Sequence, residues 1–177
     1  MDVDLAEQCR QNRCPHCGGP LHRSDYPRKP RGGPDGLGDE VCLRLSLCCG
    51  REGCRHRKMP PSCRFLGRKV YFAAIVLVVV TMRQRRLGSA SAAKLKATFG
   101  VSWETDKRWM TYFAEVFSTT STWKRIRGLV TSTVRDDDLP AGLLEVLDGA
   151  GEDKVGGLTR CLELLATGGE EAWEHSK

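Results

Sequence analysis

Four cysteines in the first third of the chain have the residue type and the spacing of a metal site. Cys14 and Cys17 form one close pair, followed by two glycines, and Cys49 and Cys54 form a slightly wider pair. Zinc binds four thiolates in a tetrahedron, and two tight turns can each supply half of them while glycines free backbone amides to face the sulfurs. This pattern predicts one zinc ion. Four thiolates leave no open position for an activated water, so the predicted ion is structural.

The second pair leaves one choice open, because Cys48 directly precedes Cys49. We favour Cys49 as the ligand, since it leaves the tighter turn and Cys48 continues a predicted strand. Three other cysteines are interpreted as non-ligands, namely Cys9, Cys42 and Cys63. Three histidines are possible substitute ligands but are better explained as polar surface residues, namely His16, His22 and His56.

The cysteine count also bears on location. The chain has nine cysteines, and its first residues, Met1 to Asp4, show no signal-peptide pattern. Both features are typical of a reducing compartment and of metal ligation rather than disulfides, so we expect a cytoplasmic protein. The uncharged run 70–82 has thirteen residues, too few to span a bilayer. It predicts a buried helix or strand and no membrane partner.

Charge is distributed unevenly along the chain. The formal net charge is +6, but residues 1–67 carry +4, residues 68–127 carry +9, and residues 128–177 carry −7. A strongly basic middle segment favours binding of a polyanion, with the acidic end kept away from phosphates or used for protein contacts. The alternative is a solvated basic face of a helix.

The segment between the two cysteine pairs predicts a hairpin. Residues 26–36 mix basic side chains with prolines and glycines, which is typical of a loop. This loop either lies across a phosphate backbone or is only a flexible connection. Residues 41–47 alternate apolar and polar side chains, the period of a half-buried strand that leads into the second pair. The candidate phosphate contacts of this part are Arg28, Lys29, Arg31, Arg57 and Lys58.

The middle segment predicts helices joined by a glycine turn. Residues 88–99 have serine caps and apolar positions on one face, Gly100 ends that helix, and Ser102 can cap a second helix over 103–117. In a helix-turn-helix unit the second helix enters the major groove of DNA with its N-terminal residues facing base edges. The alternative is an ordinary helical hairpin. The candidate base-facing residues are Glu104, Thr105, Lys107, Arg108 and Thr111.

The last part of the chain turns from basic to acidic. A short amphipathic piece, 123–130, adds Lys124 and Arg125 as candidate phosphate contacts. Leucine-rich helices are expected around 142–147 and 158–165, and their apolar faces either fold back on the core or contact a second copy or another partner. Three consecutive aspartates precede them, but consecutive carboxylates cannot all converge on one metal, so we expect no catalytic role for Asp136, Asp137 and Asp138.

In this order the parts resemble the N-terminal half of bacterial insertion-sequence transposases. The resemblance is carried by three sets of residues, namely both cysteine pairs with the basic residues after the second, residues 70–75, and the turn from Phe99 to Ser102 with Thr105, Arg108 and Trp109. That family places a zinc ribbon ahead of a three-helix DNA-binding unit. The resemblance therefore implies that 70–82 is a helix, and that the chain binds double-stranded DNA at a bacterial nucleoid.

Two features depart from that family. Asp106 occupies a position where the family usually has an apolar residue. The family's catalytic ribonuclease-H-like domain should follow, but the 60 residues after Phe117 are too few to build it. The resemblance thus implies the DNA-binding half alone, as an accessory, regulatory or truncated protein of a mobile element.

We therefore predict an α+β protein with three parts. A zinc ribbon covers 1–67, a helix-turn-helix unit covers 68–127, and an acidic, helical tail covers 128–177. The expected function is zinc-stabilised DNA binding without catalysis. The candidate protein partners of the tail are a second copy of the chain and a transposition partner. The second hypothesis is a protein-interaction adaptor built on the ribbon. An RNA-binding ribbon and a metal-dependent nuclease are further classes. The nuclease is disfavoured because residues 68–127 carry only three carboxylates, all on or near one predicted helix, namely Glu104, Asp106 and Glu115.

Overall fold

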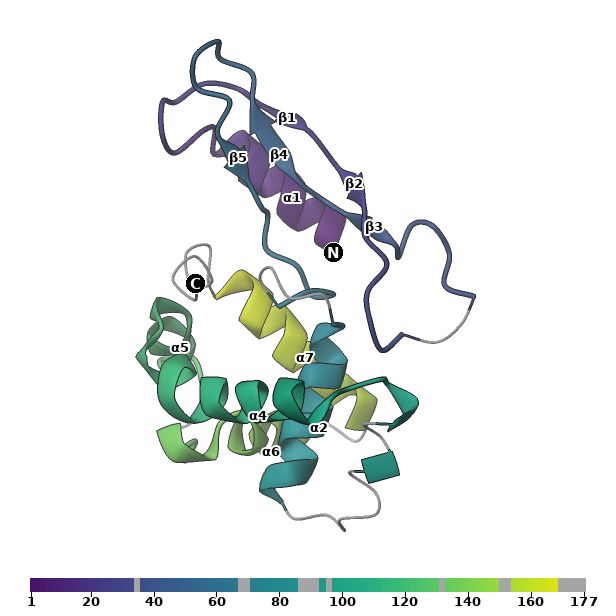
Figure 1. The fold of residues 1–177 in the computed structure, drawn as a ribbon. Coiled ribbons are helices and arrows are strands. Elements are labelled where there is room, and N and C mark those ends of the chain that lie inside the picture. Colours follow the sequence, from purple (N-terminus) through teal and green to yellow (C-terminus); the bar gives the residue numbers. More distant parts are fainter. Residues whose placement is uncertain are drawn as a thin grey trace.

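The structure is a computed structural model of the chain, and it describes residues 1–33, 36–66, 71–85, 93–94, 97–130, 133–149 and 154–168. Within these residues it combines small antiparallel sheets with helices, in agreement with the predicted α+β class. The sheets and helix α1 lie at one end of the molecule, and the other labelled helices lie at the opposite end (Figure 1). Each end has its own cluster of buried side chains.

The cysteine-bearing end is built on a three-stranded antiparallel sheet in the order β1-β4-β5. Leu21 on β1 lies opposite Cys49 on β4, so a buried apolar residue and a cysteine face each other across the sheet. The strands of this sheet are β1 (Leu21–Arg23), β4 (Leu47–Cys49) and β5 (Arg57–Lys58), and a second sheet consists of β2 (Tyr26–Pro27) and β3 (Leu43–Arg44).

The strand predicted over 41–47 is wrong in its bounds, because β3 and β4 are separate and belong to different sheets. The break lies at Ser46. Its amide donates to Asp25 Oδ1 at 2.8 Å, and its carbonyl accepts the amide of Ser24 at 2.8 Å. Both backbone groups of Ser46 are thus hydrogen-bonded to Ser24 and Asp25, which lie between β1 and β2. Cys42, which we expected on the strand, lies in the turn before β3.

The first residues of the chain form helix α1 (Asp2–Gln11), which was not predicted from the sequence. Its side chains Leu5, Ala6 and Cys9 are buried, and Cys9 belongs to the same cluster as the cysteine pairs. The helix contacts β1. Strands of two or three residues bury too little surface to be stable alone, so α1 supplies part of the core that this sheet needs.

Residues 73–82 of the apolar run are helical, as the resemblance implied, and belong to α2 (Ala73–Gln84). α2 contacts α4, α6 and α7, and Figure 1 shows these helices around it. A helix that is covered on several sides is apolar on most of its surface, which explains why apolar residues dominate this helix. The buried residues of α2 are Ala73, Ile75, Val76, Leu77, Val79 and Val80.

The glycine turn leads directly into α4 (Trp103–Thr111). Gly100 has φ +59°, a left-handed conformation that costs non-glycine residues roughly 1–2 kcal/mol. Ser102 Oγ accepts the amide of Thr105 at 3.2 Å and caps the helix, as predicted. Most of the helix expected over 88–99 lies outside the described residues, although 93–94 and 97–98 are helical.

The helix predicted over 103–117 is regular only as far as Thr111. It continues as a π-helical turn over Tyr112–Val116 and a 3-10 turn over Phe117–Thr119. The apolar stripe is buried at Trp109 and Phe113, as expected for a core-facing side of a helix. A short helix, α5 (Ser121–Ile126), follows.

The acidic segment packs against the other helices through α6 (Ala141–Gly149) and α7 (Lys154–Thr167). Leu143 on α6 and Leu165 on α7 belong to the same buried cluster as α2, so the leucine-rich faces pack inside this chain. The three aspartates before α6 do not converge, because each pairs with a different arginine. The pairs are Asp136 with Arg127, Asp137 with Arg135, and Asp138 with Arg85.

Residues 31–33 fasten the cysteine-bearing end to α2, and we call them the strap. The amide of Phe72 donates to the carbonyl of Arg31 at 3.2 Å. A Cβ on Gly33 would lie 2.4 Å from the Phe72 ring, and one on Gly32 would lie 2.7 Å from Ile75 Cδ1. The C-terminal part of the predicted loop is therefore packed against the start of α2.

A second attachment lies in the segment that precedes α2. The amide of Ala73 donates to the carbonyl of Arg64 at 2.8 Å. The Arg44 guanidinium lies 5.0 Å from the centre of the Phe65 ring, and only 5% of Arg44 is exposed. Burial lowers the pKa of Arg44, and contact with the aromatic face offsets part of the cost of burying its charge.

Candidate metal centre

The four predicted cysteines come together in the structure. The Sγ atoms of Cys14, Cys17, Cys49 and Cys54 all lie within 4.8 Å of one another. Cys17 Sγ is 3.5 Å from Cys49 Sγ, and Cys14 Sγ is 3.8 Å from Cys54 Sγ. Four sulfurs around a zinc ion, at about 2.3 Å each, would be about 3.8 Å apart. The cluster therefore has the donor set and the size to hold a metal ion, as the sequence predicted.

The first pair lies on a tight turn that its two glycines make possible. The amide of Gly18 donates to the carbonyl of Cys14 at 2.8 Å, and Gly18 has φ +69°. Gly19 is required for a different reason, which is space. A Cβ there would lie 3.0 Å from Cys49 Sγ and 3.2 Å from Cys17 Sγ. One glycine permits the turn, and the other lets the two cysteine pairs approach.

The second pair begins at the end of β4. The amide of Cys49 donates to the carbonyl of His56 at 2.8 Å, which continues the pairing of β4 with the chain after the turn. Gly53, at φ +82°, reverses the chain before Cys54. Neighbouring residues of a strand point to opposite faces, and Cys48 Sγ lies 3.7 Å from the carbonyl of Arg55. The structure thus places Cys49 in the cluster and Cys48 outside it.

Backbone hydrogen bonds favour the thiolate form at Cys17 and Cys49, but at Cys49 burial and the neighbouring thiols outweigh the Arg51 amide and raise the pKa to about 12. The hydrogen bond from the Gly19 backbone, followed by contact with the Cys54 thiol, lowers the pKa of Cys17 to about 7. The amide of Arg51 points at Cys49 Sγ at a distance of 3.4 Å. The Arg51 guanidinium also donates to the carbonyl of Cys17 at 3.1 Å, which ties the two turns together. Thiolates are the species that ligate metal ions, so these contacts suit a cation site.

The histidines near the pairs do not join the cluster within the described residues. His16 and His56 are exposed and stack on each other, with ring centres 5.7 Å apart. His22 is also exposed and lies against Gly50. The donor set is therefore four sulfurs, which zinc and other thiophilic ions prefer.

Comparison of the chain with protein-family models, with curated proteins and with solved structures finds no match. Over the described residues, no helix has both the length and the apolar character needed to cross a membrane.

The predicted phosphate contacts of the cysteine-bearing end differ in how open they are. Lys29 and Arg31 are exposed and form no salt bridge with a described residue, whereas Arg28 and Lys58 are half-buried. Arg57 is exposed, but its guanidinium donates to Ser24 Oγ at 3.2 Å. Lys29 and Arg31, which we call the loop cations, are therefore more available to a ligand than Arg28, Arg57 and Lys58.

On α4, the predicted residues Lys107, Arg108 and Thr111 are exposed. Thr105 is not, because it is only 7% exposed. Its hydroxyl lies 3.1 Å from Ser102 Oγ and accepts a hydrogen bond from Arg108 Nη2 at 3.1 Å. Thr105 therefore supports the cap of the helix, and we remove it from the candidate contact residues.

The acidic segment neutralises part of the basic segment. Asp138 and Glu145 both pair with Arg85, and these hydrogen bonds raise the pKa of Arg85. Arg127 pairs with Asp136. Of the described acidic residues, none forms a salt bridge with the exposed cations of α4 and α5. These cations, which we call unpaired because they form no salt bridge with a described residue, are Lys107, Arg108, Lys124 and Arg125. Arg108 still donates hydrogen bonds to the carbonyl of Glu104 and to Thr105 Oγ1.

The sequence interpretation missed one arrangement at the start of α4. Asp106, the acid that departs from the transposase pattern, is 1% exposed, and its Oδ2 lies 3.5 Å from Arg83 Nε on α2. The same guanidinium lies 5.8 Å from the centre of the Trp103 ring. An acid among apolar helix positions was the available signal, since a buried carboxylate needs a cationic or hydrogen-bonding partner.

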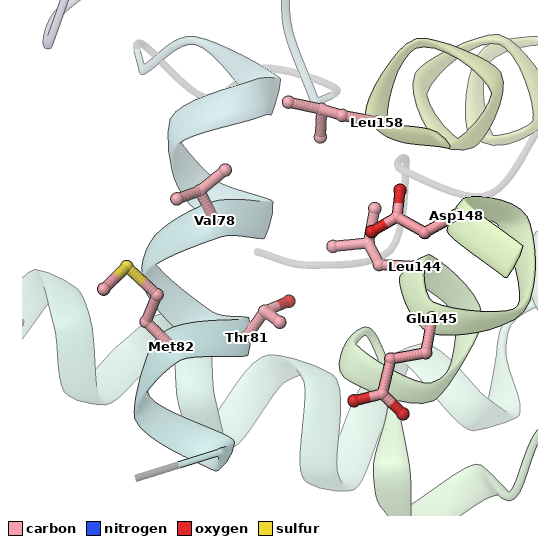
Figure 2. Close-up of a pocket in the computed structure, with 7 residues that line it drawn as sticks. All are labelled: Val78, Thr81, Met82, Leu144, Glu145, Asp148 and Leu158. Atoms are coloured by element: carbon pink, nitrogen blue, oxygen red, sulfur yellow. The ribbon is translucent and has the colours of Figure 1, made fainter. Parts of the chain in front are cut away.

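A cavity between α2, α6 and α7 was also not predicted (Figure 2). Its volume is about 340 Å³, and it shares no residue with the cysteine cluster. Glu145 at its edge is paired with Arg85. Its lining residues are Val78, Thr81, Met82, Leu144, Glu145, Asp148 and Leu158.

Proposed function

We propose that this chain is a zinc-stabilised protein that binds double-stranded DNA through α4 and its neighbouring cations. It acts by binding, as an accessory or regulatory protein of a bacterial mobile element, in the cytoplasm at the nucleoid. The observation that carries this proposal is the set of unpaired cations on α4 and α5, presented next to a capped helix after a glycine turn.

The choice of zinc follows from the donor set. Four thiolates of tetrahedral size favour zinc over the oxygen-seeking ions magnesium and calcium. Its role is to fold the cysteine-bearing end, whose sheet has strands of two and three residues. In zinc-finger peptides the metal contributes roughly 10–16 kcal/mol of folding free energy. An ion with this role needs no open coordination position.

The choice of DNA follows from charge and geometry together. Ser102 caps α4, and the buried Trp109 fixes the helix on α2, so that Lys107 and Arg108 are held outward. In helix-turn-helix proteins this N-terminal half of the second helix faces base edges. Because Asp136 and Asp138 are already paired with arginines, they do not neutralise the outward cations.

A salt titration tests the proposal. Binding to a pool of short random-sequence duplexes is measured by fluorescence anisotropy, and a protein with six phosphate contacts loses roughly a thousandfold in affinity between about 50 and 200 mM salt. The double variant Lys107→Ala and Arg108→Ala should bind at least tenfold more weakly at low salt. Arg135→Ala is the matched control, because Arg135 is exposed but paired with Asp137.

The outcomes separate the function classes. Wild-type protein that shows no salt-sensitive complex with duplex DNA contradicts the proposal. Retention of a protein partner under excess DNA would instead favour the adaptor hypothesis. Tighter binding to single-stranded RNA than to duplex DNA would favour an RNA-binding ribbon.

A further inference from the structure

Trp103 is a large apolar side chain left on the surface at the first position of α4. It is 58% exposed, whereas the other described tryptophans, Trp109 and Trp123, are 3% and 0% exposed. An indole ring carries a large apolar surface, and such rings are enriched where proteins contact partners. Its exposure leaves the indole ring accessible to a partner.

The ring of Trp103 contacts the guanidinium of Arg83, which forms an ion pair with the buried Asp106. The Arg83 guanidinium lies 5.8 Å from the ring centre, within the range of a cation–π contact. Arg83 Nε is 3.5 Å from Asp106 Oδ2, and Asp106 is 1% exposed. A buried carboxylate is costly unless it is paired. The fold therefore joins α2 and α4 by an ion pair in which Asp106 is buried, while Arg83 is 35% exposed and lies against the exposed indole.

The neighbours of Trp103 indicate the kind of partner. Lys107 lies four residues further along α4, which places it on the same face one turn away, and it is exposed without a described acidic partner. An apolar ring beside an unpaired cation matches the surface of a DNA groove, where bases and deoxyribose border the phosphates.

We propose that Trp103 contacts the bases or deoxyriboses of bound DNA directly, and that Arg83 and Asp106 are positioning residues that orient its ring. This inference rests on the proposed function, and it adds a contact that the sequence interpretation did not include. The cations of α4 and α5 attract the phosphates, while the indole makes the close contact. Because Asp106 is buried, it acts through Arg83 and never touches the DNA.

The first experiment compares Trp103→Ala and Trp103→Phe with wild type, using the same pool of short random-sequence duplexes. Loss of the indole contact with the duplex should weaken binding by roughly fivefold or more for alanine, and less for phenylalanine. Val3→Ala is the matched control, since Val3 is 50% exposed on α1. If wild type binds and Trp103→Ala binds equally well, the inference fails and the proposed function stands. If wild type does not bind, the proposed function itself fails.

The second experiment observes the ring itself by ¹⁹F NMR of protein labelled with 5-fluorotryptophan. The chain has four tryptophans, and the resonance that disappears in Trp103→Phe belongs to Trp103. Addition of duplex DNA should shift this resonance and leave those of the buried Trp109 and Trp123 in place. An unchanged Trp103 resonance at saturating DNA would overturn the inference, and this result requires no destabilised variant.

The positioning role is tested with Arg83→Gln, Arg83→Lys and Asp106→Asn. In the free protein, Arg83→Gln and Asp106→Asn should move the Trp103 resonance and weaken DNA binding several-fold, whereas Arg83→Lys should restore part of the affinity because it keeps the cation. Circular dichroism verifies that each variant is folded. Folded Arg83→Gln with an unmoved Trp103 resonance and full affinity would exclude the positioning role.

Discussion

Asp2 Oδ1 accepts the backbone amide of Cys63 at 2.8 Å, so the first turn of α1 is fastened to the segment that leads into α2. Asp2 Oδ2 also accepts the hydroxyl hydrogen of Ser62 at 2.6 Å, and the Asp2 side chain is only 8% exposed. An N-terminal residue thus serves as a link between the two ends of the molecule.

We expect Asp2→Ala to lower the free energy of unfolding by about 1–3 kcal/mol, because it leaves the Cys63 amide and the Ser62 hydroxyl without their acceptor. Urea unfolding followed by circular dichroism measures the change. Asp4→Ala is the control on the same helix, since the Asp4 side chain is 76% exposed and pairs only with the terminal amine. Equal effects of the two substitutions would show that the link contributes nothing.

Adjacent cysteines provide a sharp test of the metal centre. Cys49→Ser should abolish binding of one equivalent of zinc and unfold the cysteine-bearing end, whereas Cys48→Ser should retain the metal, because only Cys49 lies in the cluster. Elemental analysis after dialysis against a weak chelator measures the zinc content. Retention of a full equivalent by Cys49→Ser, with unchanged thermal stability, would refute the assigned ligand set.

Adjacent aspartates test a contact in the helical end. The buried Trp123 donates its indole N–H to Asp136 Oδ1 at 2.7 Å. Asp136→Ala leaves this donor unpaired in the core and should cost about 1–3 kcal/mol of stability. Asp137→Ala should have no measurable effect, since Asp137 is exposed and pairs only with Arg135. Chemical unfolding measures the stability of both variants. An Asp136→Ala variant as stable as wild type would contradict the packing of α5 through Trp123.

The strap can be tested with two glycines. Gly33→Ala places a Cβ 2.4 Å from the Phe72 ring and 2.6 Å from Leu37 Cδ1, so the strap must move away from α2, at a cost of about 1–3 kcal/mol. In Gly38→Ala the new Cβ meets only the flexible carboxylate of Glu40, so little cost is expected. Hydrogen exchange at the start of α2 should rise in Gly33→Ala alone.

The cysteine cluster was predictable because its signal is local, with two pairs of fixed spacing and glycines beside them. The choice of Cys49 over Cys48 followed from the tighter turn that Cys49 leaves, although both cysteines lie on β4. The cap at Ser102 was predictable from a capping residue, whereas the apolar run of α2 left helix or strand open and only the resemblance favoured the helix. The cluster and the cap rest on neighbours in the sequence, where residue type and spacing are informative.

Other features depended on contacts between distant residues and were therefore missed. α1 has few apolar residues, and its helix is stabilised by packing on β1 rather than by its own pattern. The break in the strand at Ser46 depends on Asp25. The pairing of Arg83 with Asp106 joins two helices across 23 positions, so no local pattern specifies which cation would meet that acid.

The strap has a further consequence for binding thermodynamics. If residues 31–33 were a slack tether, DNA that contacted both ends of the molecule would have to immobilise them relative to each other, at an entropic cost. Because the strap is already packed against α2, that order exists before binding. If the chain binds DNA as proposed, the loop cations Lys29 and Arg31 and the α4 cations would meet the duplex without first having to be fixed relative to each other.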